Sequence, residues 1–278
     1  KNLKKKLIIK KKKNKLPSII VPVHLAGNPC DMEEIFKLSK IYKFKIIEDA
    51  SHALGSTYKS NIIGSCRHST ATVLSFHPIK SITSAEGGAV LTNDKKLMEK
   101  VKMLREHGIT KNNKKFLIKN SGAWYYEQQF LGYNYRMSDV HAALGLSQIK
   151  NLKKFIKKRN IIANIYEKNL NIKGIKFQKK TENSHSSRHL FIIRVNKKIH
   201  KKLFNYLRNK GIYVNLHYIP IYRQPFYKKN FKINNFNFPN SESYYSEAIS
   251  IPVYYDLKLS DQKRVIKNIK NFISLNEK

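Results

Sequence analysis

The sequence predicts an α/β protein with a mixed, mostly parallel sheet, helices on both faces, and a smaller C-terminal α/β domain. Three observations support this prediction. Short runs rich in Val, Ile and Leu alternate with stretches of helical length along the chain, as in α/β folds. The length of 278 residues suffices for one large domain or two smaller ones. The hydrophobic content of 41% and aromatic content of 11% allow a packed core and argue against disorder.

In the first half of the chain, four apolar runs predict strands, at 19–24, 44–49, 71–76 and 89–93. A helix between the first two begins with acidic residues at 31–34, which complement the helix dipole, and runs to about Tyr42. Gly87 and Gly88 predict a turn before the fourth strand, and a helix at 95–107 follows that strand. The second strand ends in Asp49, and open α/β sheets bind ligands at the carboxyl ends of their strands.

In the second half, Ser138 and Asp139 cap a long helix whose apolar residues recur at helical spacing to about residue 170, with a break near Lys157. Further strands are predicted at 176–178, 189–195 and 212–218, alternating with helices at 198–210, 241–248 and 260–274. Long helices commonly connect domains. We therefore expect a large domain at 1–155 and a second region at 156–278, made of the rest of the long helix and a small domain.

The formal charge is +37, from 55 basic and 18 acidic side chains, which raises the alternative of a nucleic-acid-binding protein. Lysine supplies most of this charge, whereas specific nucleic-acid readers depend on the bidentate arginine side chain. The segment 16–94 carries as many acidic as basic side chains. We therefore expect no specific nucleic-acid partner.

The two cysteines, Cys30 and Cys66, form no zinc-binding or disulfide pattern, which favours the cytoplasm. Because the cysteines form no zinc-binding pattern, we expect no metal site. We expect no membrane partner, because no apolar run approaches the roughly 20 residues that span a bilayer. The chain begins at Lys1 with a lysine-rich segment that leads directly into the strand at 19–24. We expect that the N-terminal part of the natural protein is missing from this sequence.

Lys80 is the only lysine between Lys59 and Lys95, and it lies among apolar and small residues after a predicted strand. Desolvation there would lower the pKa of its amine and make the amine a nucleophile. Asp49 could keep a pyridine nitrogen protonated, and such a lysine with such a carboxylate is the protein's part of pyridoxal phosphate chemistry. Ser75 could bind a phosphate oxygen. Each residue alone is more often a surface lysine or a capping side chain, so the prediction depends on the combination.

Three segments carry a family resemblance: EDASHALGS at 48–56, SFHPIKSITSAEGGAVLTND at 75–94 and GYNYRMSDVHAALGLSQ at 132–148. They resemble the DegT/DnrJ/EryC1/StrS family of sugar aminotransferases, and LHYIPIY at 216–222 adds a similarity to members that act in pseudaminic acid biosynthesis. The resemblance implies a type I pyridoxal-phosphate-dependent transferase fold, like that of aspartate aminotransferase. It also implies a homodimer with shared active sites, and transfer of the amino group of glutamate to C4 of a UDP-linked 4-keto-6-deoxy-N-acetylhexosamine.

The resemblance also implies roles for individual residues. Lys80 matches the catalytic lysine, which bonds to the cofactor and moves protons, and Asp49 matches the partner of the pyridine nitrogen. Ser75 matches the serine that contacts the phosphate, and Asn134 matches the asparagine that reaches the phosphate from the partner subunit. His52 stands where the family has a Gln or His beside the cofactor ring, although a buried structural histidine is an equal alternative.

Four residues are candidates for substrate binding. Arg136 could bind the carboxylate of glutamate bidentately or form a structural ion pair. His217, Tyr218 and Tyr222 fall in the region that lines the sugar entrance in the family, although a packing role is the stronger alternative for them.

Two alternative functions stay open. Lys80 favours transamination over the dehydration catalysed by family members with histidine at this position, but another nucleotide-sugar aminotransferase of the family would show the same motifs. The family also has a phosphate-binding loop and a ring-stacking aromatic residue before the strand at 19–24, which this sequence lacks. A degenerate or truncated subunit without catalytic activity is therefore the second alternative.

Overall fold

The computed structural model describes residues 2–118, 122–231 and 238–276. The chain divides into two compact units, which are described separately below. The first unit comprises Lys1–Leu25, Pro29–Leu152 and Glu182–His185, and the second comprises Ala26–Asn28, Lys153–Thr181 and Ser186–Lys278. The domain boundary expected at 155/156 stays a prediction.

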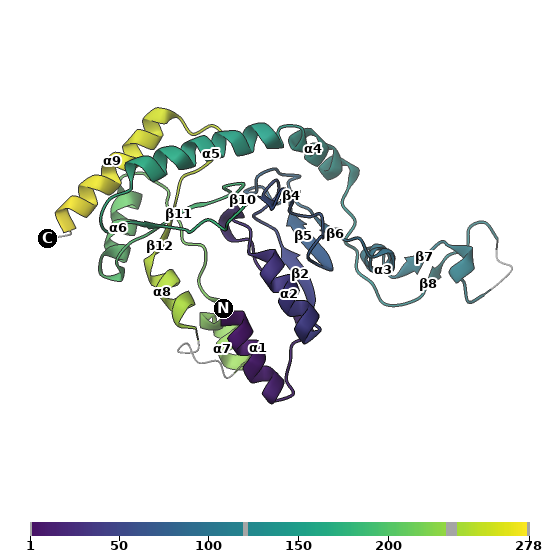
Figure 1. Ribbon diagram of the computed structural model, residues 1–278. Coiled ribbons are helices and arrows are strands. Elements are labelled where there is room, and N and C mark those ends of the chain that lie inside the picture. The colour runs from purple at the N-terminus through teal and green to yellow at the C-terminus, as the bar shows by residue number, and fades with distance from the viewer. Residues whose placement is uncertain (1, 119–121, 232–237, 277–278) are drawn as a thin grey trace. The chain divides into compact units, whose positions relative to one another are not determined.

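A four-stranded sheet forms the centre of the first unit, with the strand order β1-β2-β5-β6. Figure 1 labels β2, β5 and β6. Its strands are β1 (Ile19–Ile20), β2 (Lys45–Asp49), β5 (Ala71–Ser75) and β6 (Gly88–Leu91). β1 and β5 both run parallel to β2, whereas β6 runs antiparallel to β5. The predicted α/β class with a mixed sheet is thus confirmed.

Helices α1 (Asn2–Lys12) and α2 (Met32–Tyr42) contribute to the core of this unit. The core residues are apolar side chains from these helices and from one face of the sheet: Leu7, Met32, Phe44, Ile46 and Leu74, among others. α2 begins where predicted, because the side chain of Asp31 accepts a hydrogen bond from the backbone N of Glu34. The opposite face of the sheet is open, and Val23, Val73 and Val90 on it are 36–49% exposed.

The remaining elements of the first unit are short, apart from α3 (Lys95–Arg105), which matches its prediction. β3 (Thr57–Tyr58), β4 (Asn61–Ile62) and β10 (Ser184–His185) form a small antiparallel sheet. β7 (Ile109–Thr110) pairs with β8 (Glu127–Gln128), and a 3₁₀ helix lies at Asn113–Lys115. Another 3₁₀ helix, at Leu25–Gly27, belongs partly to each unit. Sequence analysis missed these two-residue strands, since strands of that length show no alternating pattern.

The long predicted helix is two helices, α4 (Asp139–Ile149) and α5 (Leu152–Asn169). Ser138 caps α4 as predicted, since its side chain accepts a hydrogen bond from the backbone N of His141. The predicted break near Lys157 is wrong, because the interruption lies at Lys150 and Asn151. There Asn151 N donates to Gln148 O over a tighter turn, and the amide side chain of Asn151 bonds to Ser147 O, 3.5 Å away.

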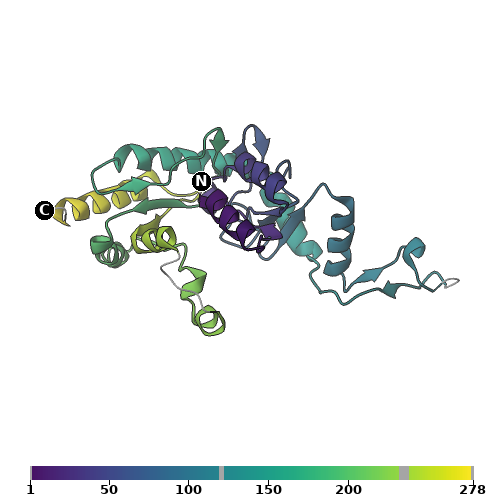
Figure 2. The same cartoon turned by 60° about the horizontal axis from the view of Figure 1, so that its bottom comes forward.

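The second unit contains a three-stranded antiparallel sheet with the order β12-β11-β9. Its strands are β9 (Lys176–Phe177), β11 (Phe191–Arg194) and β12 (Ala248–Ile251). α5, α6 (Lys197–Asn209) and α9 (Leu259–Asn276, yellow in Figures 1 and 2) pack with this sheet around one apolar core. Shorter helices are a 3₁₀ turn at Ile221–Arg223, α7 (Pro225–Asn230) and α8 (Pro239–Glu247).

Two predictions for the second unit are wrong. Residues 212–218 form no strand, and within them only Asn215 makes a β-bridge, to Ser250. Ala248, predicted as the end of a helix, instead begins strand β12, whose four residues are all buried. A fully buried strand lacks the apolar–polar alternation that would have revealed it. Within the described residues, no helix combines the length and apolar character needed to cross a membrane.

Candidate active site

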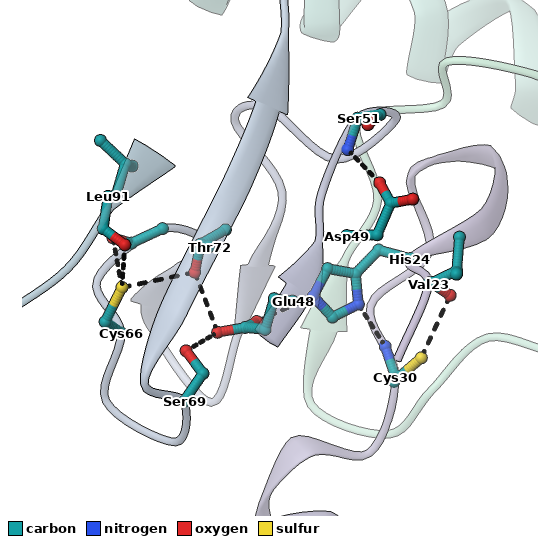
Figure 3. Close-up of polar contacts among 11 residues, drawn as sticks. Val23, His24, Cys30, Glu48, Asp49, Ser51, Cys66, Ser69, Thr72 and Leu91 are labelled. Carbon is teal, nitrogen blue, oxygen red and sulfur yellow. Dashed lines mark hydrogen bonds and ion pairs between the residues drawn. The ribbon is translucent and has the colours of Figure 1, made fainter. Parts of the chain in front are cut away.

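Asp49 ends strand β2 on the open face of the first unit's sheet. It pairs with Val23 on one side and Val73 on the other, and Val73 pairs in turn with Val90. The four residues therefore form one row across the sheet, in which Asp49 is the only charged member. Its Oδ1 accepts a hydrogen bond from Ser51 N at 3.0 Å, which orients the carboxylate (Figure 3).

Lys80 lies in the loop between β5 and β6, where its backbone N donates to His77 O at 2.9 Å. The side chain is partly buried. Burial lowers the pKa of its ammonium group, and the charge of Asp49 opposes this shift without cancelling it. The structure thus brings Lys80 within electrostatic range of Asp49, as the predicted site requires.

Ser75 and His52 belong to the same unit. Ser75 follows Val73 by two positions on β5 and shares the face of Asp49; its Oγ lies 3.5 Å from His77 N. His52 is buried in the turn that follows β2. A contact with the cofactor ring and a packing role are both compatible with that position.

Asn134 and Arg136 lie in the exposed segment between β8 and α4. Asn134 forms a β-bridge with Glu106, and Arg136 Nη1 donates to His107 Nε2 at 2.9 Å. The guanidinium keeps further N–H groups for a carboxylate. No hydrogen bond or ion pair joins Asn134 or Arg136 to Asp49 or Lys80 within the described residues.

Met137 brings this segment against the loop that carries Lys80. A Cβ atom built on Gly87 would lie 2.4 Å from Met137 Cε and 2.6 Å from Ser84 Oγ. Gly87 also has a φ of +155°, which other residues rarely adopt. The glycine therefore permits the close approach of the two segments.

The three predicted sugar-site residues belong to the second unit. His217 Nδ1 lies 2.8 Å from Ser250 Oγ, and His217 O accepts a hydrogen bond from the Tyr244 hydroxyl at 2.8 Å. Tyr222 is buried and stacks on Phe238, with ring centroids 4.5 Å apart, whereas Tyr218 is half exposed. His217 and Tyr222 therefore have packing partners within their own unit.

The first-unit residues fit pyridoxal phosphate. The open row offers an apolar surface for a planar ring, since Val23 and Val73 flank the carboxylate of Asp49. The lowered pKa of Lys80 suits a nucleophilic amine, and Ser75 supplies a hydroxyl on the same face for a phosphate oxygen. This combination could hold the cofactor.

Sequence analysis overlooked two histidines, His24 and His107. His24 is fully buried and hydrogen-bonds to Glu48, whereas His107 accepts the hydrogen bond from Arg136. The adjacent acids Glu48 and Asp49 could have pointed to His24. Adjacent strand residues face opposite sides of a sheet, so one of the two carboxylates had to face the core and needed a hydrogen-bond partner there. No comparable pattern marked His107.

Comparison with known proteins connects this chain to a family. Residues 4–270 match the model of the DegT/DnrJ/EryC1/StrS aminotransferase family. The chain is 39% identical over 250 residues to UDP-4-amino-4,6-dideoxy-N-acetyl-beta-L-altrosamine transaminase of Campylobacter jejuni. The aligned region covers 87% of this chain and 62% of that protein. It is 37% identical over 262 residues to the protein MJ1066 of Methanocaldococcus jannaschii, covering 92% and 67%.

Solved structures of aminotransferases have the same fold as this chain. Helicobacter pylori PseC, an aminotransferase of pseudoaminic acid biosynthesis, superposes with a TM-score of 0.85 at 32% identity, covering 96% of this chain and 70% of PseC. The PLP form of Spr1654 from Streptococcus pneumoniae gives a TM-score of 0.80 at 28% identity, covering 91% of this chain and 68% of Spr1654.

The chain spans about two thirds of the length of the curated relatives it matches, from 62% to 67% for the two named above. The family match covers nearly the whole chain, and the fold is that of solved sugar aminotransferases. The chain belongs to the DegT/DnrJ/EryC1/StrS aminotransferase family.

Proposed function

We propose that this protein is a pyridoxal-phosphate-dependent nucleotide-sugar aminotransferase. It would move the amino group of glutamate to C4 of a UDP-linked 4-keto-6-deoxy-N-acetylhexosamine, as in pseudaminic acid biosynthesis. The observation that carries the proposal is Lys80, with a pKa lowered by burial, within electrostatic range of Asp49 on an open apolar sheet face. The relatives named transaminases support the same reaction.

Pyridoxal phosphate, when bound, supplies an electron sink for the electrons of the broken Cα–H bond. Lys80 Nζ would move a proton from Cα of the amino donor to C4′ of the cofactor in the first half of the reaction, and from C4′ to C4 of the sugar in the second half. Asp49 would hold the protonated pyridine nitrogen, and Ser75 would donate a hydrogen bond to the phosphate. His52 would lie beside the ring. In this proposal residues 1–155 form the cofactor-binding domain and residues 156–278 carry the small domain.

Arg136 would bind the carboxylate of glutamate with the N–H groups that His107 does not engage. Asn134 would contact the phosphate from the partner subunit. His217, Tyr218 and Tyr222 are the proposed sugar-side residues, of which Tyr218 is the one with a half-exposed ring.

We infer a homodimer with shared active sites from helix α4. This helix has no buried residue, although it carries several large apolar side chains. Val140 is 78% exposed and Leu146 is 66% exposed, and Leu144 and Ile149 are also exposed. Such a surface is typical of a protein interface. The segment with Asn134 and Arg136 directly precedes α4, so contact between two copies there would bring these residues near the partner subunit.

A cytoplasmic location is part of the proposal, and the two free thiols Cys30 and Cys66 support it. The lysine-rich surface charge has no role in the proposed reaction. The proposal includes no specific nucleic-acid partner and no membrane partner.

The test is to incubate the purified protein with pyridoxal phosphate, ¹⁵N-glutamate and a panel of nucleotide-linked 4-keto sugars. The proposal expects ¹⁵N in the amino sugar formed from the UDP-linked substrate. Lys80→Arg should abolish the product, whereas Lys59→Arg, at an exposed lysine paired with Glu33, should leave it unchanged. Product from a different nucleotide sugar alone would indicate the family alternative. A folded protein that binds no cofactor would indicate the non-catalytic subunit.

A further inference from the structure

A buried polar network lies on the face of β2 opposite Asp49. Glu48 precedes Asp49 on the strand, and the two side chains point to opposite faces. Glu48 is 3% exposed and His24 is 0% exposed. His24 Nε2 lies 2.8 Å from Glu48 Oε2, while Thr72 Oγ1, at 3.1 Å, and Ser69 Oγ donate to Glu48 Oε1 (Figure 3).

The hydrogen bonds fix where the protons lie. The backbone N–H of Cys30 donates to His24 Nδ1 at 3.0 Å, so Nδ1 carries no proton and Nε2 carries one. The imidazole therefore donates to Glu48, which is an ionised carboxylate with three donors. Burial alone would raise the pKa of Glu48, but the hydrogen bonds from His24, Ser69 and Thr72 outweigh it and lower the pKa.

His24 forms hydrogen bonds with both Glu48 and Asp49 of strand β2. Its side chain binds the Glu48 carboxylate, and its backbone N donates to Asp49 O at 3.0 Å. Asp49 N donates to Pro22 O at 2.9 Å, and Ala50 N donates to Val73 O at 2.9 Å. The backbone of Asp49 is thereby fixed on both sides at the point where the sheet meets the proposed cofactor site.

We propose that His24 and Glu48 are positioning residues for Asp49: their buried hydrogen bond holds the end of β2 so that the Asp49 carboxylate meets the cofactor ring in one fixed place. This inference rests on the proposed function. A misplacement of about 1 Å in an active site can lower the rate by a factor of roughly 10². Hydrogen bonds that fix Glu48, the residue next to Asp49, would therefore affect catalysis. The alternative is that the network serves folding stability only.

The two possibilities differ in what the folded variants do with the cofactor. His24→Phe and Glu48→Gln both remove the charged hydrogen bond, while His24→Gln keeps an N–H near the position of Nε2. Met32→Ala is the matched control, because Met32 is a core residue of the same unit with no part in the network. All variants are compared with the wild-type chain at a temperature where circular dichroism reports the folded state.

The readouts are the affinity for pyridoxal phosphate, the absorbance of the bound cofactor across pH, and the rate of the first half-reaction with glutamate. We expect His24→Phe and Glu48→Gln to shift the midpoint of the spectral pH transition and to slow the half-reaction by roughly 10- to 100-fold. His24→Gln should fall between His24→Phe and the wild type. Met32→Ala should keep the wild-type spectrum and midpoint despite its lower stability.

Variants that are less stable yet show the wild-type spectrum, midpoint and rate would overturn the inference and leave the proposed function intact. If His24→Phe does not fold, Ser69→Ala, which removes one donor to the same carboxylate, provides the same comparison with a smaller expected shift. A wild-type chain that gives no cofactor absorbance would overturn the proposed function and this inference together.

Discussion

Burial lowers the pKa of the Lys80 ammonium group, and the carboxylate of Asp49 opposes that shift without cancelling it. Asp49 ends β2, whereas Lys80 lies in the loop that follows β5, the strand paired with β2. A lysine in this setting releases its proton more readily than an exposed one, while the nearby carboxylate limits the effect.

The pKa of Lys80 should fall further in Asp49→Asn, because the substitution removes the negative charge that raises it. The pH dependence of acylation of Lys80 in the cofactor-free protein, followed by peptide mass spectrometry, measures this shift. Asp94→Asn, at the N-cap of α3, is the control and should leave the profile unchanged. A profile that moves to higher pH in Asp49→Asn would refute the electrostatic assignment.

Ser75→Ala should weaken binding of pyridoxal phosphate by about tenfold, the usual effect of losing one hydrogen bond to a charged group. The residue lies on the sheet face of Asp49, where the phosphate is proposed to bind. Fluorescence titration with the cofactor gives the dissociation constant. The exposed Ser260→Ala serves for comparison, and equal affinities in the two variants would remove Ser75 from the site.

Arg136→Lys should raise the KM for glutamate by about tenfold and change kcat less, because lysine cannot form the bidentate pair with a carboxylate. Steady-state rates at saturating nucleotide sugar separate the two constants. Arg105→Lys, which changes an exposed pair with the adjacent Glu106, is the control. An unchanged KM for glutamate would mean that Arg136 does not bind the substrate and only forms its structural hydrogen bond with His107.

Glu48→Gln should destabilise the protein by about 2 kcal/mol at neutral pH. The folded-state pKa of Glu48 lies below its unfolded value, so its stabilising effect is present above the unfolded pKa of about 4.5 and is lost as the pH falls through the folded pKa. The difference in free energy of unfolding between wild type and variant should therefore shrink in acid. Urea unfolding at neutral and acidic pH checks this, and a difference that stays constant or grows in acid would contradict it.

An aspartate at Val140 or Leu146 should convert a dimer into monomers, because a charge buried in an interface without a partner is costly. Sedimentation velocity measures the oligomeric state. Leu275→Asp, at a side chain that is equally exposed on α9, should leave the dimer intact. A wild-type monomer, or a dimer that persists in both α4 variants, would exclude α4 as the interface.

The sequence allowed prediction of those parts of the fold that local patterns determine. Strand β2 and helix α2 appeared within one or two residues of their observed ends, because an apolar run and an acidic cap mark them. The break at Lys150 and Asn151 was misplaced, since the local hydrogen bonds of a polar pair decide it, rather than the apolar spacing. β12 was missed because tertiary pairing with β11 determines it.

For the candidate site, the motifs selected Lys80 and Asp49, whose charges interact and whose roles stay predictions. The partners that hold such residues were harder to predict. The bond between His24 and Glu48 joins positions 24 residues apart, and that between Arg136 and His107 joins positions 29 apart. Contacts over such separations depend on how the strands are arranged, and no spacing rule in the sequence expresses them.

The central claim is that Lys80 is the cofactor-binding lysine. The direct measurement is to incubate the purified protein with pyridoxal phosphate, reduce it with borohydride, and map the labelled peptide by mass spectrometry. The account predicts a pyridoxyl label on Lys80 in the wild type and its loss in Lys80→Arg, with Lys59→Arg labelled as wild type. A folded protein that carries no label, or carries it on another lysine, would contradict the account.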